Sequence, residues 1–211
     1  MSQTPYIGKR LELVSMDPHF HDISIALYQQ EQNDRLVFLV HSYSRKEDAG
    51  ERIASLVSTM KILGGLESED DGLLYFPCGD AHEQAIKRIF LESCKADPAA
   101  SVSALPLHIR DRKTGCEIKA TYGGDGIYQL SSEDTEQNCE RRVMAVTRGL
   151  LKLAQMDEVE ESHDKVAFSC GQSHDALIGL LLIRAPNVRA AIREAEMMAS
   201  RGVLAAPASQ G

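Results

Sequence analysis

An eleven-residue segment occurs twice in this chain of 211 residues, and the repeat strongly constrains the fold. Phe76-Pro-Cys-Gly-Asp-Ala-His-Glu-Gln-Ala-Ile86 aligns with Phe168-Ser-Cys-Gly-Gln-Ser-His-Asp-Ala-Leu-Ile178, with five identical positions of eleven. Upstream, Glu51-Arg52 aligns with Glu140-Arg141 at an offset of 89 residues, whereas the eleven-residue segments align at an offset of 92. We place the three additional residues of the second half in an acidic loop. We interpret the chain as an internal duplication, because a repeated segment indicates a repeated structural unit.

Both halves predict the same order of elements: strand, strand, helix, strand, helix. Apolar and β-branched runs at 22–29 and 35–43 predict a hairpin, and runs at 105–110 and 116–122 predict its counterpart. A helical pattern follows each hairpin, and a second helix follows each copy of the repeated segment. We therefore expect an α+β fold in which duplicated ββαβα units form one pseudo-twofold domain, with a mixed sheet and helices packed mainly on one face.

The expected domain covers the whole chain. Repeat 1 is placed at about 20–97 and repeat 2 at about 103–200, with an N-terminal strand at 8–16 and a loose tail at 203–211. No linker rich in Pro, Gly or Ser separates the two repeats. We therefore expect them to form one unit, either edge to edge or face to face.

The repeated segment predicts a strand–turn–helix corner that carries a cysteine and a histidine in each half. In a functional interpretation, Cys78 and Cys170 lie beside helix N-termini, where the pKa of a thiol is lowered, while His82 and His174 serve as bases or metal ligands. If the two corners meet at the pseudo-twofold axis, they form one Cys₂His₂ site for a divalent metal such as zinc. In a structural interpretation, the cysteines are small buried residues, the glycines permit a tight turn, and Asp80 with Glu83 forms a capping box.

A second candidate metal site lies near the N-terminus. On a strand, His19 and His21 would point to the same face, and His41 at the end of a later strand is a third ligand candidate. The second half has no counterpart of this pair, which favours a role beyond folding. The alternative is a pair of exposed histidines after Asp17-Pro18.

A glycine-rich segment, Gly123-Gly-Asp-Gly126, raises the question of phosphate binding. It lacks the Lys-Ser/Thr of a P-loop and the strand–glycine loop–helix context of a dinucleotide site. Asp-Gly between two apolar runs is instead typical of a hairpin turn, which is the interpretation that we favour.

Composition excludes several classes of protein. The chain carries 23 Lys and Arg against 31 Asp and Glu, a formal net charge of −8, and its one basic cluster at 108–113 is typical of a charged turn, so we expect no nucleic-acid partner. No apolar run approaches the roughly 18 residues of a membrane-spanning helix, and the N-terminus lacks a secretory pattern. The five cysteines are odd in number and widely spaced, which predicts free thiols and a cytoplasmic location.

The sequence contains no complete catalytic constellation. We therefore expect a scaffold that binds a small molecule or a protein partner and forms a homo-oligomer. The alternative is a metal-dependent or Cys/His enzyme with its site at the seam between the repeats, where metal-bound water or a thiolate would be the nucleophile.

Overall fold

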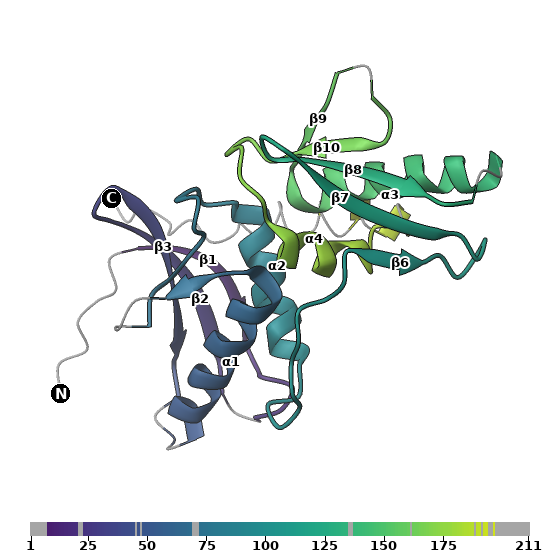
Figure 1. Ribbon diagram of the computed structural model, residues 1–211. Coiled ribbons are helices and arrows are strands. Elements are labelled where there is room, and N and C mark those ends of the chain that lie inside the picture. The colour runs from purple at the N-terminus through teal and green to yellow at the C-terminus, as the bar shows by residue number, and fades with distance from the viewer. Residues whose placement is uncertain are drawn as a thin grey trace.

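Two similar series of elements follow one another in the computed structural model (Figure 1). The model describes residues 8–20, 23–44, 46, 48–68, 72–134, 137–160, 162–187, 189–190, 192–193 and 196. The first half consists of β1 (Lys9–Val14), β2 (Ile25–Gln32), β3 (Arg35–Ser42), α1 (Asp48–Gly64), β4 (Glu67–Ser68), β5 (Leu74–Tyr75) and α2 (Glu83–Lys95). The second half consists of β6 (His108–Arg110), β7 (Glu117–Gly124), β8 (Ile127–Ser132), α3 (Gln137–Ala154), β9 (Asp157–Glu158), β10 (Lys165–Ala167) and α4 (Asp175–Leu182).

Each half forms its own antiparallel sheet, so the predicted single mixed sheet is wrong. The strand orders are β1-β2-β3-β5-β4 and β6-β7-β8-β10-β9. After α1 and after α3, the chain forms the edge strand of its sheet (β4 or β9) and then reverses direction. The next strand is therefore an inner one: β5 lies between β3 and β4, and β10 lies between β8 and β9. This return makes every pair of neighbouring strands antiparallel. The α+β class and the similarity of the two halves are confirmed, with a βββαββα order in place of ββαβα.

The four helices pack against their own sheets and against one another. In the first half, α1 packs on β3 and α2 on β1, and in the second half α3 packs on β8 and α4 on β6. Contacts between the halves run through the helices, and Figure 1 shows α4 in the middle of the molecule, next to α2. Buried apolar side chains of both halves form one cluster, which includes Leu56 and Ile89 from the first half and Val146 and Leu181 from the second. The seam between the halves is therefore part of the core.

Burial in the first helix of each half corrects the alignment of the repeats. Four buried positions in α1 (Ala49, Leu56, Met60, Leu63) recur in α3 ninety residues later (Cys139, Val146, Leu150, Leu153), and at the same offset the buried Arg52 meets the half-buried Arg142. Arg52 therefore corresponds to Arg142 and not to Arg141, and the offset between the helices differs by two residues from that of the corners. The predicted match of Glu51-Arg52 with Glu140-Arg141 had paired Arg52 with the exposed Arg141. A match between charged residues on the solvent-facing side of a helix does not indicate which positions correspond in the two structures.

An Arg–Asp ion pair repeats in both halves, fully buried in the first and part-buried in the second, and supports this register. In the first half, Arg52 donates through Nε and Nη2 to Asp17 Oδ2 (3.1 and 2.9 Å), and its Nη2 also donates to the carbonyl of Cys94 (3.0 Å). In the second half, Arg142 donates to both carboxylate oxygens of Asp111 (2.8 and 3.0 Å) and to the carbonyl of Pro186 (2.9 Å). Each arginine thereby ties its helix to the loop before the hairpin and to the end of the second helix.

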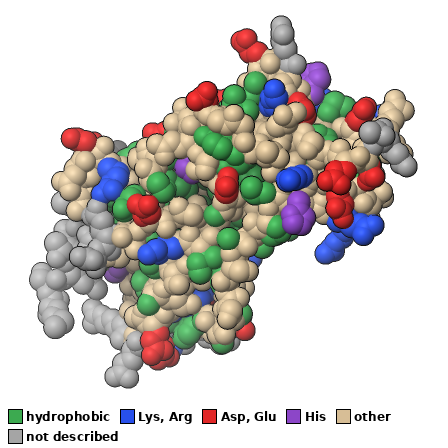
Figure 2. All heavy atoms as spheres, in the orientation of Figure 1, with side chains coloured by type: hydrophobic (Ala, Val, Ile, Leu, Met, Phe, Trp, Pro, Cys, Tyr) green, Lys and Arg blue, Asp and Glu red, His purple; other side chains and the backbone are tan. Residues whose placement is uncertain are grey.

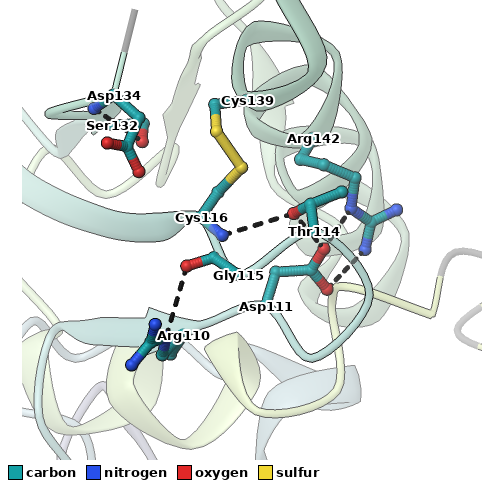
Figure 3. The surroundings of a disulfide bond; sticks show 9 residues. All are labelled: Arg110, Asp111, Thr114, Gly115, Cys116, Ser132, Asp134, Cys139 and Arg142. Atoms are coloured by element: carbon teal, nitrogen blue, oxygen red, sulfur yellow. Dashed lines mark hydrogen bonds and ion pairs between the residues drawn. A yellow bond between two sulfur atoms is a disulfide. The ribbon is translucent and has the colours of Figure 1, made fainter. Parts of the chain in front are cut away.

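Two of the five cysteines form a disulfide, which contradicts the prediction of five free thiols (Figure 3). Cys116, just before β7, is bonded to Cys139 in the first turn of α3, with the two Cα atoms 5.6 Å apart. The packing of α3 on its sheet brings these two positions together, and sequence spacing alone does not reveal this. Cys78, Cys94 and Cys170 remain free. The cytoplasmic location was inferred from free thiols and stays a prediction.

The expectation that the chain has no nucleic-acid or membrane partner concerns its surface charge and the hydrophobicity of its helices. Acidic and basic side chains are interspersed over the face seen in Figure 2. No helix in the described part of the chain is long and apolar enough to cross a membrane. The predicted tail at 203–211 lies outside the described residues, as does most of the segment 187–200.

Candidate metal centre

The two copies of the repeated segment fold into matching corners, which we define as segments 76–82 and 168–174. In each corner, the chain leaves β5 or β10 at a phenylalanine and turns back, with Gly79 N–H donating to the Phe76 carbonyl (2.9 Å) and Gly171 N–H to the Phe168 carbonyl (3.0 Å). The two glycines have φ values of 84° and 73°, in the left-handed region that residues with a Cβ avoid. The same backbone turn therefore presents one cysteine and one histidine in each half.

The two corners meet at the seam, which is the condition stated above for a shared Cys₂His₂ site. Cys78 Sγ lies 3.2 Å from His82 Nε2, and Cys170 Sγ lies 3.2 Å from His174 Nε2. The rings of the two histidines contact each other with centroids 4.6 Å apart. All four ligand atoms lie within 4.8 Å of one another. Residues 92 positions apart in the sequence therefore form one Cys₂His₂ cluster.

The spacing of these atoms fits a tetrahedral zinc ion. Zinc bonds of about 2.3 Å to sulfur and about 2.0 Å to nitrogen give edges of about 3.5 Å between sulfur and nitrogen in a tetrahedron. The observed 3.2 Å contacts lie close to such an edge, and the longer distances in the group, up to 4.8 Å, would shorten when the ligands close around a metal ion. Two thiolates and two imidazoles in this geometry favour zinc among the common divalent metals.

Aromatic rings shield the cluster on both sides of the seam. Phe76 contacts the ring of His82 (5.0 Å) and also that of His174 from the other half (5.6 Å). Phe168 makes the matching contacts with His174 (4.6 Å) and His82 (5.4 Å). His174 is only 6% exposed. The imidazoles therefore lie against aromatic rings, and His82 is half-buried, like the two sulfurs.

The histidines occupy the N-cap positions of the second helix in each half, which contradicts the capping-box interpretation. His82 is the N-cap of α2 and His174 that of α4, and neither side chain makes a capping hydrogen bond. His82 has φ 38° and ψ 55°, a left-handed conformation that is unfavourable for a residue with a Cβ. Because these side chains face the cluster instead of capping their helices, helix capping does not explain them.

Burial keeps the imidazoles neutral, as metal binding requires. Burial lowers the pKa of His82. Burial, together with the neighbouring His82, lowers the pKa of His174 to about 4.

The pKa of the Cys78 thiol moves in the opposite direction from the sequence-based expectation. Burial and the adjacent Cys170 raise the pKa of Cys78 to about 12. Burial therefore outweighs the helix N-terminus, which was expected to lower it.

The two corners are supported by different polar contacts. In the second half, the backbone N–H of His174 donates to Tyr128 Oη (2.6 Å), and Tyr128 Oη donates to Asp175 Oδ1 (2.6 Å). In the first half, Glu83 accepts hydrogen bonds from Lys87 and Lys9 (2.7 Å each). Tyr128 is a supporting residue that sequence reasoning missed, because only its cross-strand position places it under the corner.

The structure does not bring the N-terminal histidines into this cluster. His19 is exposed, and its Nε2 donates to the carbonyl of Lys95 (3.1 Å). His41 lies in β3 against the rings of Tyr28 and Tyr43. Neither belongs to a group of potential metal ligands among the described residues, and His21 lies outside them. The three-histidine site therefore stays a prediction.

Two other candidate positions have structural roles. Cys116 and Cys139 lie near Asp134, but their disulfide occupies both sulfurs (Figure 3). The glycine-rich segment forms the hairpin turn between β7 and β8, as predicted, with positive φ at Asp125 (49°) and Gly126 (74°).

Comparison of the chain with protein-family models, curated proteins and solved structures finds no match. The geometry of the site is therefore the basis for a functional proposal.

Proposed function

We propose that this chain is a zinc-binding scaffold whose Cys₂His₂ site joins its two halves. The observation that carries the proposal is the convergence of Cys78 and His82 with Cys170 and His174, with all four ligand atoms within 4.8 Å of one another. Each half supplies two ligands, so a metal held here would link the corners across the seam. A zinc ion held by these four residues would supply strong bonds between the halves.

A structural role fits this site better than a catalytic one. Four protein ligands complete a tetrahedral coordination shell, whereas catalytic zinc sites keep one position open for water or substrate. The rings of Phe76 and Phe168 also lie against both imidazoles. We therefore expect the metal to stabilise the fold, as it does in small zinc domains.

The 3.2 Å contact between Cys78 and His82 also suits the alternative, a thiol enzyme. A thiolate–imidazolium pair requires a lowered pKa at the cysteine. Burial instead raises the pKa of Cys78 and lowers that of His82, so both side chains favour their neutral forms. The enzyme alternative is less favoured for this reason.

A groove beside α1 supports the scaffold part of the proposal. It has a volume of about 550 Å³ and lies between β3 and α1, with Leu39, Ile53, Val57 and Lys61 in its lining. Ligand pockets commonly have volumes of about 300–1,000 Å³ and mostly apolar walls. The homo-oligomer expected from the sequence stays a prediction that light scattering would test.

The metal content of the native, untagged protein tests the proposal. Elemental analysis should find one zinc ion per chain. The variants His82→Ala and His174→Ala, one in each half, should both lose it, because each removes one of the four ligands. The matched control is the double variant His19→Ala/His21→Ala, which should keep the metal.

The opposite results would each have a clear meaning. Loss of the metal from the His19→Ala/His21→Ala protein alone would move the site to the N-terminal loop. Absence of metal from the native protein, together with no cobalt absorption band on titration with Co²⁺, would contradict the proposal.

A further inference from the structure

We infer that the Cys₂His₂ site is a redox switch, in which a hydroperoxide converts Cys78 and Cys170 into a disulfide between the halves and releases the metal. The inference rests on the proposed function, since it concerns the regulation of the same site. It follows from the position, exposure and pairing of the sulfurs.

The two sulfurs are near neighbours, and a disulfide requires them to approach further. They come from opposite corners and lie within 4.8 Å of each other, while a disulfide requires about 2.05 Å. Both belong to tight turns at the ends of short strands, where Gly79 and Gly171 follow directly. The bond would join residues 78 and 170 across the seam that the metal otherwise bridges.

The sulfurs are also partly accessible. Cys78 and Cys170 are half-buried, as is His82, whereas His174 is buried. Metal coordination keeps both sulfurs as thiolates, and oxidation of cysteine follows thiolate character and exposure. A small oxidant can therefore reach the sulfurs, which as coordinated thiolates are the groups of the site that it would oxidise.

The reaction balances with a hydroperoxide as the oxidant. One thiolate attacks the peroxide oxygen and becomes a sulfenic acid, and one hydroxide leaves. The second thiolate attacks the sulfenic sulfur, a disulfide forms, and a second hydroxide leaves. The two sulfurs lose two electrons in total, which the O–O bond accepts as it breaks. The metal ion then retains only two imidazole ligands and dissociates.

The remaining cysteines provide internal controls. Cys94 is free but buried, at 1% exposure, and Cys116 and Cys139 are already oxidised to a disulfide. The site therefore contains the only pair of free thiols in the chain that are both half-buried. We expect peroxide to act at this pair first.

The experiment uses the full-length zinc-loaded protein, with its metal content measured before any oxidant is added. Hydrogen peroxide is then added in small molar excess, released zinc is followed with a chromogenic chelator, and non-reducing peptide mass spectrometry reports the crosslink. Zinc release and the Cys78–Cys170 peptide should rise together in a one-to-one ratio. A dithiol reductant with added zinc should reverse both.

Two variants make the result specific. Cys94→Ser should behave as the native protein does, because Cys94 lies outside the site. Cys170→Ser removes one ligand and one of the two sulfurs, so it should hold zinc more weakly and should give no crosslink at Cys78 when peroxide is added.

The outcomes separate this inference from the proposed function. A protein that carries no zinc and binds no Co²⁺ contradicts the proposed function before peroxide is added. A zinc-loaded protein that releases no metal, or releases it without the crosslink, overturns the switch and leaves a structural zinc site.

Discussion

Replacement of Gly126 by alanine should weaken the metal site without changing any ligand. Gly126 lies in the β7–β8 turn, directly against the second corner, and its carbonyl accepts the N–H of Phe168 (3.1 Å). A Cβ at this position would lie 2.5 Å from the Phe168 carbonyl oxygen and 3.0 Å from Gly171 Cα. The corner that carries Cys170 would therefore have to move.

The matched control is Gly115→Ala. Gly115 has φ 77°, close to the 74° of Gly126, but a Cβ there meets nothing within 4 Å. Both substitutions pay about 1–2 kcal/mol for the left-handed conformation. Only Gly126→Ala adds the steric conflict, which costs about 1–3 kcal/mol when atoms are forced into a packed region.

These energies predict measurable differences between the two variants. Each kcal/mol lowers the Tm of a domain of this size by about 2–4 °C, so Gly126→Ala should melt about 2–12 °C below Gly115→Ala. Loss of support around a ligand also typically weakens metal affinity about 10–100-fold, which Co²⁺ titration in competition with a chelator would measure. Equal melting temperatures and equal affinities in the two variants would refute the role assigned to the turn.

Three further predictions concern the interactions that hold each half. Asp17→Asn should lower the free energy of unfolding by about 3–5 kcal/mol in denaturant titration, because it leaves the fully buried Arg52 without its counter-ion. Asp111→Asn should lower it by less, because Arg142 is 18% exposed and can be hydrated. Equal losses in the two variants would contradict this ranking. Burial alone would raise the pKa of Asp111, but hydrogen bonds from Arg142 and Thr114 lower it below its ordinary 3.8. The stability that Asp111 contributes is therefore present above pH 3.8 and lost as pH falls through the lowered pKa, so the deficit of Asp111→Asn should shrink between pH 7 and pH 3, and a constant deficit would contradict the assignment. Removal of the disulfide by Cys116→Ser/Cys139→Ser should cost about 3 kcal/mol for a loop closed over 23 residues, and an unchanged denaturation midpoint would argue against a stabilising bond.

The sequence was informative where a rare residue recurs at a fixed distance. Cys and His at the same two positions of both corners suggested one shared site if the corners meet, with a structural interpretation as the alternative, and the structure places the four ligand atoms within 4.8 Å of one another. The hairpin turn at Asp125 and Gly126 was also predictable, because Asp-Gly between apolar runs has a local conformational cause.

The sequence was uninformative where the outcome depends on tertiary packing. The Cys116–Cys139 disulfide forms because α3 lies across its sheet, and the spacing of 23 residues carries no trace of that. The correspondence of Arg52 with Arg142 was missed because an exposed Glu-Arg pair matched one residue out of register. Similarly, the two antiparallel sheets depend on the positions of β5 and β10 between their neighbouring strands. These strands are too short to show an alternation of apolar and polar residues in the sequence.

The similarity of the two halves explains why the site contains two cysteines and two histidines. One corner supplies a single Cys-x-x-x-His pair, and two ligands are too few to hold a structural zinc ion in a closed site. The second copy supplies the remaining ligands only when the two corners meet, as His82 and His174 do here. A metal ion at this seam would therefore favour one arrangement of the two halves over others that bury a similar apolar area. This selection gives a physical reason for a histidine, His82, to remain at the start of α2 in a left-handed conformation that favours glycine.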